Sequence, residues 1–330
     1  YLGGQVNIDG GVLSANNGQV ISQQGNVIDI GNVDIVGSNT LIVNKLSSVE
    51  ATMGSIVNLN NGGSKATTTS LKKIDNVTAG GPLISIGAAN ATNNIVTLDS
   101  ITNISSQGGL LVGAGSGTTT LNIVNTRIDD PASVNDVNVS SGRVDINLNA
   151  SHTSNSYNSR ASGILNLNIN QGSSATINNN FTLTTINNRG DLILGSGTRN
   201  ASINSDVNNA STLVISAPGS GSQANRLLTI NGNYTGSSAA LIQMSASVAN
   251  GDSSSSDRLI VNGNTAGSTK VSIELVSDPA NSTAMTKGLE MVRVTGESNG
   301  EFTLGGERVT AGGYEYLLTR GQNNAAKNWY

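Results

Sequence analysis

The chain has 330 residues, a formal net charge of −4, 40 glycines, no cysteine and a single histidine, His152. Only 12% of the residues are charged and 3% are aromatic, so the large rings that usually anchor a compact core are scarce. The acidic balance argues against a nucleic-acid partner. No stretch approaches the roughly 20 apolar residues of a membrane-spanning helix, and no signal peptide opens the sequence.

Residues 1–223 contain repeated short runs in which apolar and polar residues alternate. This period of two indicates half-buried β-strands, and no stretch shows a helical period over three turns. The clearest runs are 143–151, 164–172 and 211–217, with predicted inward sets Val144, Ile146 and Leu148; Leu165, Leu167 and Ile169; and Leu213, Ile215 and Ala217. We therefore expect an all-β chain.

The spacing of these runs predicts how the strands are arranged. Val144 and Leu165 are 21 residues apart, and so are Leu192 and Leu213. Imperfect repeats of this length, each with an apolar face too small to form its own core, favour a parallel β-helix (β-solenoid) with stacked rungs. Several Asn-Gly dipeptides, among them those at Asn17, Asn61, Asn231, Asn262 and Asn299, are also typical of tight hairpins. An antiparallel sandwich or barrel is therefore the competing fold.

Two polar segments are candidate ligand-binding surfaces. In the loop 60–73, Lys65, Lys72 and Lys73 form a basic spot that could bind sulfated glycans, although such a spot is also typical of a solvated loop. Further along, Arg189, Gly190 and Asp191 form the tripeptide that cell-adhesion proteins present to integrins. A corner between two strands explains the same residues, because Leu192 and Leu194 follow at once with strand spacing.

Candidate catalytic residues are few. His152 would have to serve any Ser-His-Asp triad, yet nothing near it resembles a nucleophile turn. The stretch "NGDSSSSDR" is superficially similar to the Gly-Asp-Ser-Gly nucleophile region of chymotrypsin-like proteases, but Ser254 stands where glycine is needed, so we expect a loop. Asp129 and Asp130 are adjacent, so an extended chain would point them apart rather than pair them for glycoside hydrolysis. One histidine and no cysteine also give no zinc site. We expect no enzyme activity and no cofactor.

The repeat length and the aromatic content of the sequence change near residue 224, which divides the chain into residues 1–223 and residues 224–330. Segments 226–244 and 258–275 align at an offset of 31, and this alignment matches Leu228, Ile230, Ile242 and Met244 with Leu259, Val261, Ile273 and Leu275. Five of the nine aromatics lie in the last 29 residues: Phe302, Tyr314, Tyr316, Trp329 and Tyr330. Large rings after small-residue rungs predict a cap that closes the end of the stack.

The ordered blocks "DRLIVNGNTAGSTKVSIELV", "GLEMVRVTG", "EFTLGG", "AGGYEYLLTRG" and "NWY" closely resemble the C-terminal passenger region of pertactin-like autotransporters of Gram-negative bacteria. The resemblance spans about residues 224–330, and residues 1–223 share only its texture. It implies a right-handed parallel β-helix exported through the outer membrane, with a C-terminal autochaperone segment that folds first. It also implies that an α-helical linker and a membrane barrel, which this sequence lacks, would follow Tyr330.

These features together favour a bacterial adhesin or virulence factor that is displayed on the cell surface or secreted. Its expected partner is a host matrix protein, a glycan or a cell receptor. Three alternatives stay open. The chain could associate with itself and aggregate bacteria, it could be a stalk for a domain upstream of Tyr1, or it could be a secreted ligand of a host receptor.

Overall fold

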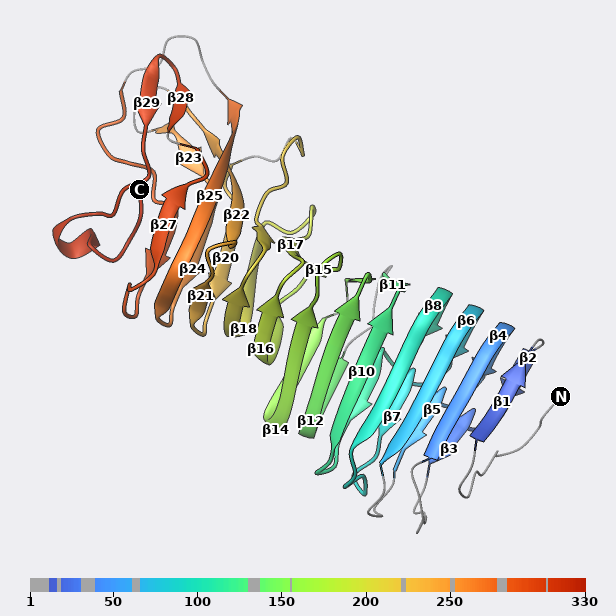
Figure 1. Cartoon of the computed structure of the whole chain (residues 1–330). Coiled ribbons are helices and arrows are strands. Elements are labelled where there is room, and N and C mark those ends of the chain that lie inside the picture. Colours follow the sequence, from blue (N-terminus) through green and yellow to red (C-terminus); the bar gives the residue numbers. More distant parts are fainter. Residues whose placement is uncertain are drawn as a thin grey trace. The chain divides into compact units, whose positions relative to one another are not determined.

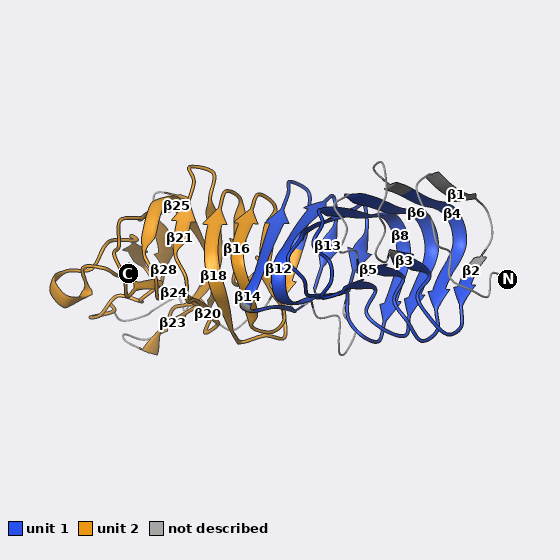
Figure 2. Ribbon diagram, turned by 90° about the horizontal axis from the view of Figure 1, so that it is seen from below, with its two compact units in different colours: residues 1–174 blue, residues 175–330 orange. Residues whose placement is uncertain are grey.

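The computed structural model describes residues 12–16, 19–30, 39–60, 66–129, 137–154, 156–220, 224–249, 253–277, 284–306 and 308–330. Their regular structure is almost entirely β, as the alternating runs predicted, apart from a short 3-10 helix η2 (Asn323–Ala325). The chain forms two compact units, residues 1–174 and 175–330 (Figure 2). The change of texture at residue 224 falls inside the second unit.

The first unit is built from strands that lie side by side in Figure 1 and pair in parallel. Its strands are β1 (Val12–Asn16), β2 (Gln19–Ser22), β3 (Ile28–Ile30), β4 (Asn39–Ala51), β5 (Val57–Leu59), β6 (Thr67–Ala79), β7 (Ile84–Ile86), β8 (Asn94–Ser106), β9 (Leu111–Gly113), β10 (Thr118–Val124), β11 (Arg127–Ile128), β12 (Val137–Asn149), β13 (His152–Thr153) and β14 (Tyr157–Ile169); β15 (Ser174–Ile177) begins at its last residue.

The core of the first unit consists of apolar side chains stacked in columns. Leu71 pairs with Leu98, Leu98 with Ile123, and Ile123 with Leu148, and all four are fully buried. The predicted pairing of Val144 with Leu165, 21 residues later, is also observed. Each column buries small aliphatic groups against their counterparts on neighbouring strands, which is how a chain with few aromatics obtains a core.

One corner of the first unit is repeated in five successive passes of the chain, each of which we call a rung. Its residue has a left-handed backbone conformation each time, although none is a glycine: Lys45, Lys73, Ser100, Asn125 and Ala150, with φ between 45° and 56°. Side-chain hydroxyls satisfy the backbone N–H groups just after three of these corners. Thr126 accepts from Ile101 N, Ser151 from Thr126 N, and Ser173 from Ser151 N, at 3.1–3.2 Å. This hydroxyl ladder stabilises the corner without a glycine.

The second unit contains the remaining strands. They are β16 (Phe181–Asn188), β17 (Asp191–Leu194), β18 (Asn200–Asn209), β19 (Thr212–Val214), β20 (Leu227–Ile230), β21 (Tyr234–Gly236), β22 (Leu241–Ser247), β23 (Ser255–Ser256), β24 (Arg258–Val261), β25 (Thr265–Ser277), β26 (Val292–Val294), β27 (Glu301–Leu304), β28 (Val309–Ala311) and β29 (Tyr314–Tyr316). Leu192 pairs with Leu213 as predicted. Ala217 is exposed rather than inward, because β19 ends at Val214 and the chain turns.

Part of the predicted alignment between the two long repeats is wrong. Leu228 pairs with Leu259 and Ile230 with Val261, at the expected offset of 31. Ile242, however, pairs with Val271 and Met244 with Ile273, at an offset of 29. The corner that follows Gly236 is two residues longer than the corner that follows Gly267. A shift of two residues keeps every side chain on its original face, so the alternation could not reveal it.

Antiparallel pairing is confined to short pieces in the described residues. It joins β22 to β23 over two residue pairs and β28 to β29 over three, together with isolated bridges from Trp329 to Val292 and Arg320. The other strand pairings of these residues are parallel, between one strand and another roughly 21 to 33 residues further on.

Candidate functional site

The C-terminal end of the second unit contains an aromatic column. The rings of Tyr234 on β21 and Phe302 on β27 are stacked with centroids 6.0 Å apart, and Phe302 meets Trp329 edge-to-face at 5.6 Å. All three residues are buried. Such aromatic pairs stabilise a fold by about 0.5–1.5 kcal/mol beyond the area that they bury. The column therefore links the last rungs to the C-terminal residues.

The buried hydroxyl of Tyr234 is fully engaged. It accepts a hydrogen bond from Asn209 Nδ2 at 3.1 Å and lies 3.1 Å from Thr269 Oγ1. Burial raises the pKa of Tyr234 above its usual value, because an ionised phenolate would lose its hydration in this environment. Asn209 in turn accepts from Asn188 Nδ2 at 2.8 Å. A continuous series of hydrogen bonds thus connects Tyr234 of the aromatic column to the ends of β18 and β16.

The backbone of the last residues covers the final rung. Trp329 N donates to Val292 O at 2.8 Å, and Met291 N donates to Trp329 O at 2.9 Å. On the other side of this segment, Thr319 and Tyr330 exchange two hydrogen bonds of 2.9 Å. Residues 328–330 are therefore held between β26 and residues 319–321, and they satisfy backbone groups that would otherwise be exposed at a sheet edge.

Arg320 also holds the C-terminal residues in place, through the ring of Trp329. Its guanidinium lies 4.5 Å from the centroid of the Trp329 ring, which is cation–π geometry. The same group donates to the carbonyl oxygens of Ser298 and Gly300 at 2.8 and 2.9 Å. A single side chain therefore connects the turn before β27 to the C-terminal segment.

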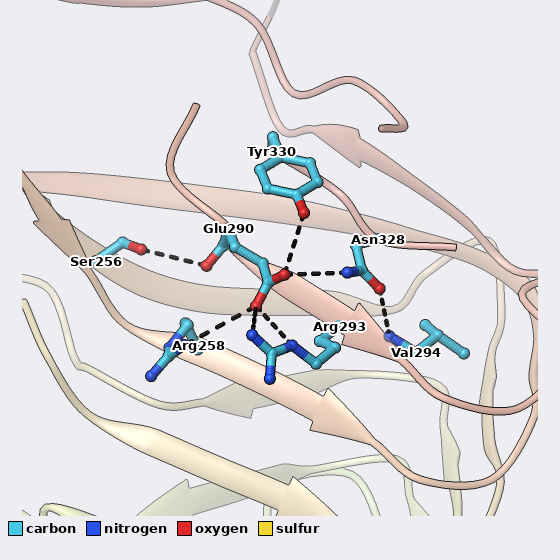
Figure 3. Close-up of polar contacts among 7 residues, drawn as sticks. All are labelled: Ser256, Arg258, Glu290, Arg293, Val294, Asn328 and Tyr330. Carbon is cyan, nitrogen blue, oxygen red and sulfur yellow. Dashed lines mark hydrogen bonds and ion pairs between the residues drawn. The ribbon is translucent and has the colours of Figure 1, made fainter. Parts of the chain in front are cut away.

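Glu290 is the centre of a second set of polar contacts, shown in Figure 3. One carboxylate oxygen accepts from Arg293, with N–O distances of 2.7 and 2.8 Å, and lies 3.9 Å from Arg258. The other accepts from Asn328 Nδ2 at 3.0 Å and from the hydroxyl of Tyr330 at 3.2 Å. Glu290 thereby links β24, β26 and the C-terminal residues.

The predicted cap residues occupy different environments. Phe302 and Trp329 are buried in the aromatic column. Tyr314 is 40% exposed on the hairpin formed by β28 and β29. Tyr316, on the same hairpin, is half-buried, and its hydroxyl is buried without a hydrogen-bond partner. These four rings were predicted to act together because aromatic residues are concentrated near the C-terminus. In the structure, only Phe302 and Trp329 lie in the column.

The structure describes two of the three lysines of the predicted basic spot. Lys65 lies outside the described residues. Lys72 is on β6 next to Asp99 of β8, whereas Lys73 occupies a left-handed corner and is exposed. Lys45 occupies the same corner one rung earlier, since Asn44 pairs with Lys72 and Leu46 with Ile74. Two exposed lysines are thus held at equivalent positions of neighbouring rungs, about 4.8 Å apart by strand spacing.

The Arg-Gly-Asp tripeptide lies between β16 and β17. Arg189 is exposed, Gly190 is buried in the bend and Asp191 begins β17 with its side chain outward. Asn188, just before it, is buried and donates to Asn209 Oδ1 and to Thr212 O, both at 2.8 Å. The tripeptide therefore follows directly on a hydrogen-bonded corner, and its glycine does not protrude.

Three of the residue types considered for catalysis meet in the first unit. His152 Nδ1 lies 2.6 Å from Ser174 Oγ, and His152 Nε2 lies 3.3 Å from Asp129 Oδ1. Burial lowers the pKa of His152, with Arg127 lowering it further and Asp129 opposing this effect. The N–H groups of Ser173 and Ser174 donate to Asn170 O and Ser151 O, so neither is available to stabilise an oxyanion.

The remaining candidates are Asp130 and Ser254. Asp130 lies outside the described residues. Ser254 Oγ accepts from Ala249 N at 2.9 Å and shapes the turn before β23.

Comparison with known proteins identifies this part of the chain. Residues 201–318 match the family model described as Autochaperone Domain Type 1. This match supports an autotransporter passenger with an autochaperone region. An autochaperone region of this kind implies export to the cell surface or secretion. In the described residues, no helix is long and apolar enough to cross a membrane.

A relative adds a second likeness. The chain is 38% identical over 110 residues to the uncharacterized protein YdeU of Escherichia coli (strain K12). This match includes 33% of the present chain and spans about a quarter of the length of YdeU.

Sequence reasoning missed several residues of the autochaperone region. Tyr234 lies far from the other aromatics in sequence and was not grouped with them. Arg320 and Glu290 make several of their contacts with partners 20 to 40 residues away, and such contacts leave no local pattern. Within 224–330, the available signal was the pair of long repeats, which placed Tyr234 one rung above Thr265.

Proposed function

We propose that this chain is a right-handed parallel β-helix exposed on a bacterial surface, or released from it, that serves as an adhesin. The parallel pairing and the autochaperone match support the β-helix and the export route. The adhesive role is supported by one observation, which is the chemistry of the outer face of the first unit.

That outer face presents columns of short uncharged polar side chains. Thr97 pairs with Asn122, Asn122 with Asn147, and Asn147 with Asn168. Asn147 Nδ2 donates to Asn122 Oδ1 at 2.9 Å, and Asn168 Nδ2 donates to Asn147 Oδ1 at 2.8 Å. Asn122 and Asn147 are half-buried, so the ladder presents amide groups at the surface. A fixed row of such groups suits a polar ligand that makes many weak hydrogen bonds.

The paired lysines extend this proposal to anionic ligands. Lys45 and Lys73 occupy left-handed corners, a conformation that disfavours a side chain by roughly 1–2 kcal/mol. Two like charges on adjacent rungs also repel each other. Since neither feature stabilises the fold, we interpret the pair as a contact for sulfated groups of host glycans.

The test is a binding panel of extracellular-matrix proteins, sulfated glycans and integrins, with sedimentation of the same purified chain. Saturable binding to one class supports the adhesin. For glycans, the double variant Lys45→Asn/Lys73→Asn removes both charges and keeps a residue that tolerates positive φ. Lys270→Asn, at an exposed position of the second unit, is the matched control. Absence of binding to every member of the panel would contradict the proposal.

Self-association is the second candidate, and the same outer face favours it. Its charges are neutralised locally, because Lys72 lies beside Asp99, and Asp145 pairs with Arg143 at 2.7 Å. Little repulsion would therefore separate two such faces. Dimers in the sedimentation experiment, combined with an empty panel, would establish this candidate in place of the first.

A further inference from the structure

The second half of β25 has an open edge. β27 pairs with β25 only from Ser268 to Val271, and the last such hydrogen bond runs from Gly305 N to Val271 O at 2.8 Å. β22 covers the opposite edge as far as Ser277. Among the described residues, no strand pairs with Ser272–Ser277 on the side away from β22. The hydrogen-bonding groups of that edge are therefore available to another strand.

An apolar cavity of about 370 Å³ lies beside this edge. Ile273 and Leu275 of β25 form one wall together with Ala246, and the hairpin β28–β29 contributes Tyr316 and nearby Leu317. Ile273 and Leu275 were predicted to be core residues, yet both are only half-buried. The interior of the last rung is thus incompletely covered, and the cavity is large enough for two or three apolar side chains.

The hairpin that flanks the cavity is a sheet of its own. β28 pairs only with β29 among the described strands, and this two-stranded sheet is separate from the one that contains β25. Figure 1 shows the hairpin beside the far end of β25. The buried Tyr316 hydroxyl, which lines the cavity, has no hydrogen-bond partner. Such a group costs about 1–3 kcal/mol until a partner reaches it.

The exposed apolar residues of the second unit belong to the open edge strand and to the hairpin or the residue after it. In the described residues of this unit, the large hydrophobic side chains that remain exposed are Val276, Tyr314 and Leu317. Val276 belongs to the open edge strand, and the other two belong to the hairpin or follow it directly. Leu317 also lines the cavity, so its exposed side chain forms part of the cavity rim.

From these features we infer that the edge of β25 binds an extended peptide segment of a partner protein by strand addition. The peptide backbone pairs with Ser272–Ser277, and alternate apolar side chains enter the cavity lined by Ile273 and Leu275. The open backbone edge selects an extended chain rather than a lipid or a helix, because only a strand satisfies a row of alternating N–H and C=O groups. This inference does not depend on the adhesive function proposed above.

The probe is a fluorescein-labelled peptide with the sequence of residues 270–277, KVSIELVS, whose alternation matches the strand that it would extend. Its anisotropy is measured against the full 330-residue chain. We expect saturable binding. N-methylation of one alternate set of peptide amides should abolish binding, because these N–H groups face the β25 edge, whereas N-methylation of the other set should leave it within about threefold.

Two variants of the chain distinguish binding at the edge and cavity from nonspecific hydrophobic binding of the peptide. Ala246→Leu fills part of the cavity and should weaken peptide binding at least tenfold while the chain stays folded by circular dichroism. Leu317→Asp places a charge at the 62% exposed rim and should weaken it similarly. Met53→Asp, at a 74% exposed position of the first unit, is the matched control and should bind normally.

Several results would overturn the inference. Equal binding by all variants, equal effects of the two N-methyl series, or no binding at millimolar peptide would each exclude strand addition at this edge. Sedimentation of the free chain decides the identity of the partner. A dimer that the peptide dissociates would show that a second copy occupies the edge and would overturn the assignment to a different protein.

Discussion

The carboxylate of Asp257 and the backbone N–H of Arg226, 31 residues apart in sequence, form a 2.9 Å hydrogen bond in the interior of the second unit. The other carboxylate oxygen of Asp257 accepts the N–H of Ser245 at 2.7 Å. Asp257 is fully buried. One carboxylate therefore satisfies two buried N–H groups from different passes of the chain, which neither a hydroxyl nor an aliphatic side chain could replace.

The guanidinium of Arg226 extends the same polar centre. It donates to the carbonyl oxygens of Leu194, Gly195, Thr198 and Ile215. Burial lowers the pKa of Arg226, and the nearby charge of Asp257 opposes this effect. Arg226 and Asp257 thus join successive rungs through the backbone rather than through apolar packing.

Substitution of Asp257 should be severely destabilising. Asp257→Ala leaves two buried N–H groups without acceptors, so we expect a loss of about 2–5 kcal/mol in the free energy of unfolding. Asp257→Asn keeps one carbonyl oxygen and should lose roughly half as much. Urea unfolding followed by circular dichroism measures both changes. Asp191→Asn, an exposed carboxylate, should change stability by under about 0.5 kcal/mol; equal losses at both positions would refute this role for Asp257.

Removal of a ring from the aromatic column should impair folding. Trp329→Ala loses the contacts with Phe302 and Arg320, and we expect a loss of about 3–5 kcal/mol. Tyr316→Ala, at a half-buried position, should also reduce stability. Tyr314→Ala, at a 40% exposed position, is the control. Refolding yield after dilution from urea and surface yield in the exported protein report the effect. Normal yields of the Trp329 and Tyr316 variants would contradict the role of these rings in folding the C-terminal end of the chain.

The Glu290 cluster should hold the C-terminal residues in place. Glu290→Gln removes the charge that faces Arg293 and Arg258, both partly exposed, so the expected cost is only about 1 kcal/mol. Hydrogen exchange of the Trp329 and Thr319 amides should become faster. The control is Glu315→Gln, which breaks an exposed 2.6 Å pair with Arg308 and should leave those amides unchanged. If both variants behave alike, Glu290 does not fasten the closure.

The half-buried His152 should make stability depend on pH. Its pKa lies below the usual value of about 6.5 in the folded chain, so the unfolded chain binds more protons as the pH falls through this value. Stability is therefore retained at neutral pH and lost between about pH 6.5 and the lower folded pKa. Thermal unfolding at pH 7.5 and 5.0 should show a smaller difference for His152→Gln than for the native chain. An identical difference would exclude this residue as the cause.

The Arg-Gly-Asp tripeptide should tolerate a conservative change. Asp191 points outward at the start of β17, so Asp191→Glu should fold normally, with an unchanged unfolding midpoint. Attachment to integrin-bearing cells should be unaffected, because the tripeptide lies in a hydrogen-bonded bend. If the folded variant loses attachment, the tripeptide is a ligand after all.

The sequence predicted the inward residues better than their partners. Val144, Ile146 and Leu148 face inward, and Leu192 pairs with Leu213, because the alternation of side chains along a strand is a local property. The offset between Ile242 and Val271 was missed because it depends on corner length, which alternation does not encode.

The candidate site was predictable only in part, for a related reason. Composition drew attention to Phe302 and Trp329, since rings are rare in this chain. Composition could not show that Tyr314 would be exposed, because that depends on a hairpin that forms a sheet of its own. Polar residues such as Asp257 gave no signal, because their roles consist of hydrogen bonds to backbone groups far away in sequence.

The left-handed corners of the first unit separate surface chemistry from folding. Thr126, Ser151 and Ser173, which come after corner positions, make the hydrogen bonds that secure the turns. The corner residues themselves differ widely and include lysine, serine, asparagine and alanine. Ser100, Asn125 and Ala150 therefore sit at points that hydrogen bonds between neighbouring residues have already stabilised. Along this line an exported protein can change its charge and antigenic character, one position at a time, while the path of its backbone stays the same.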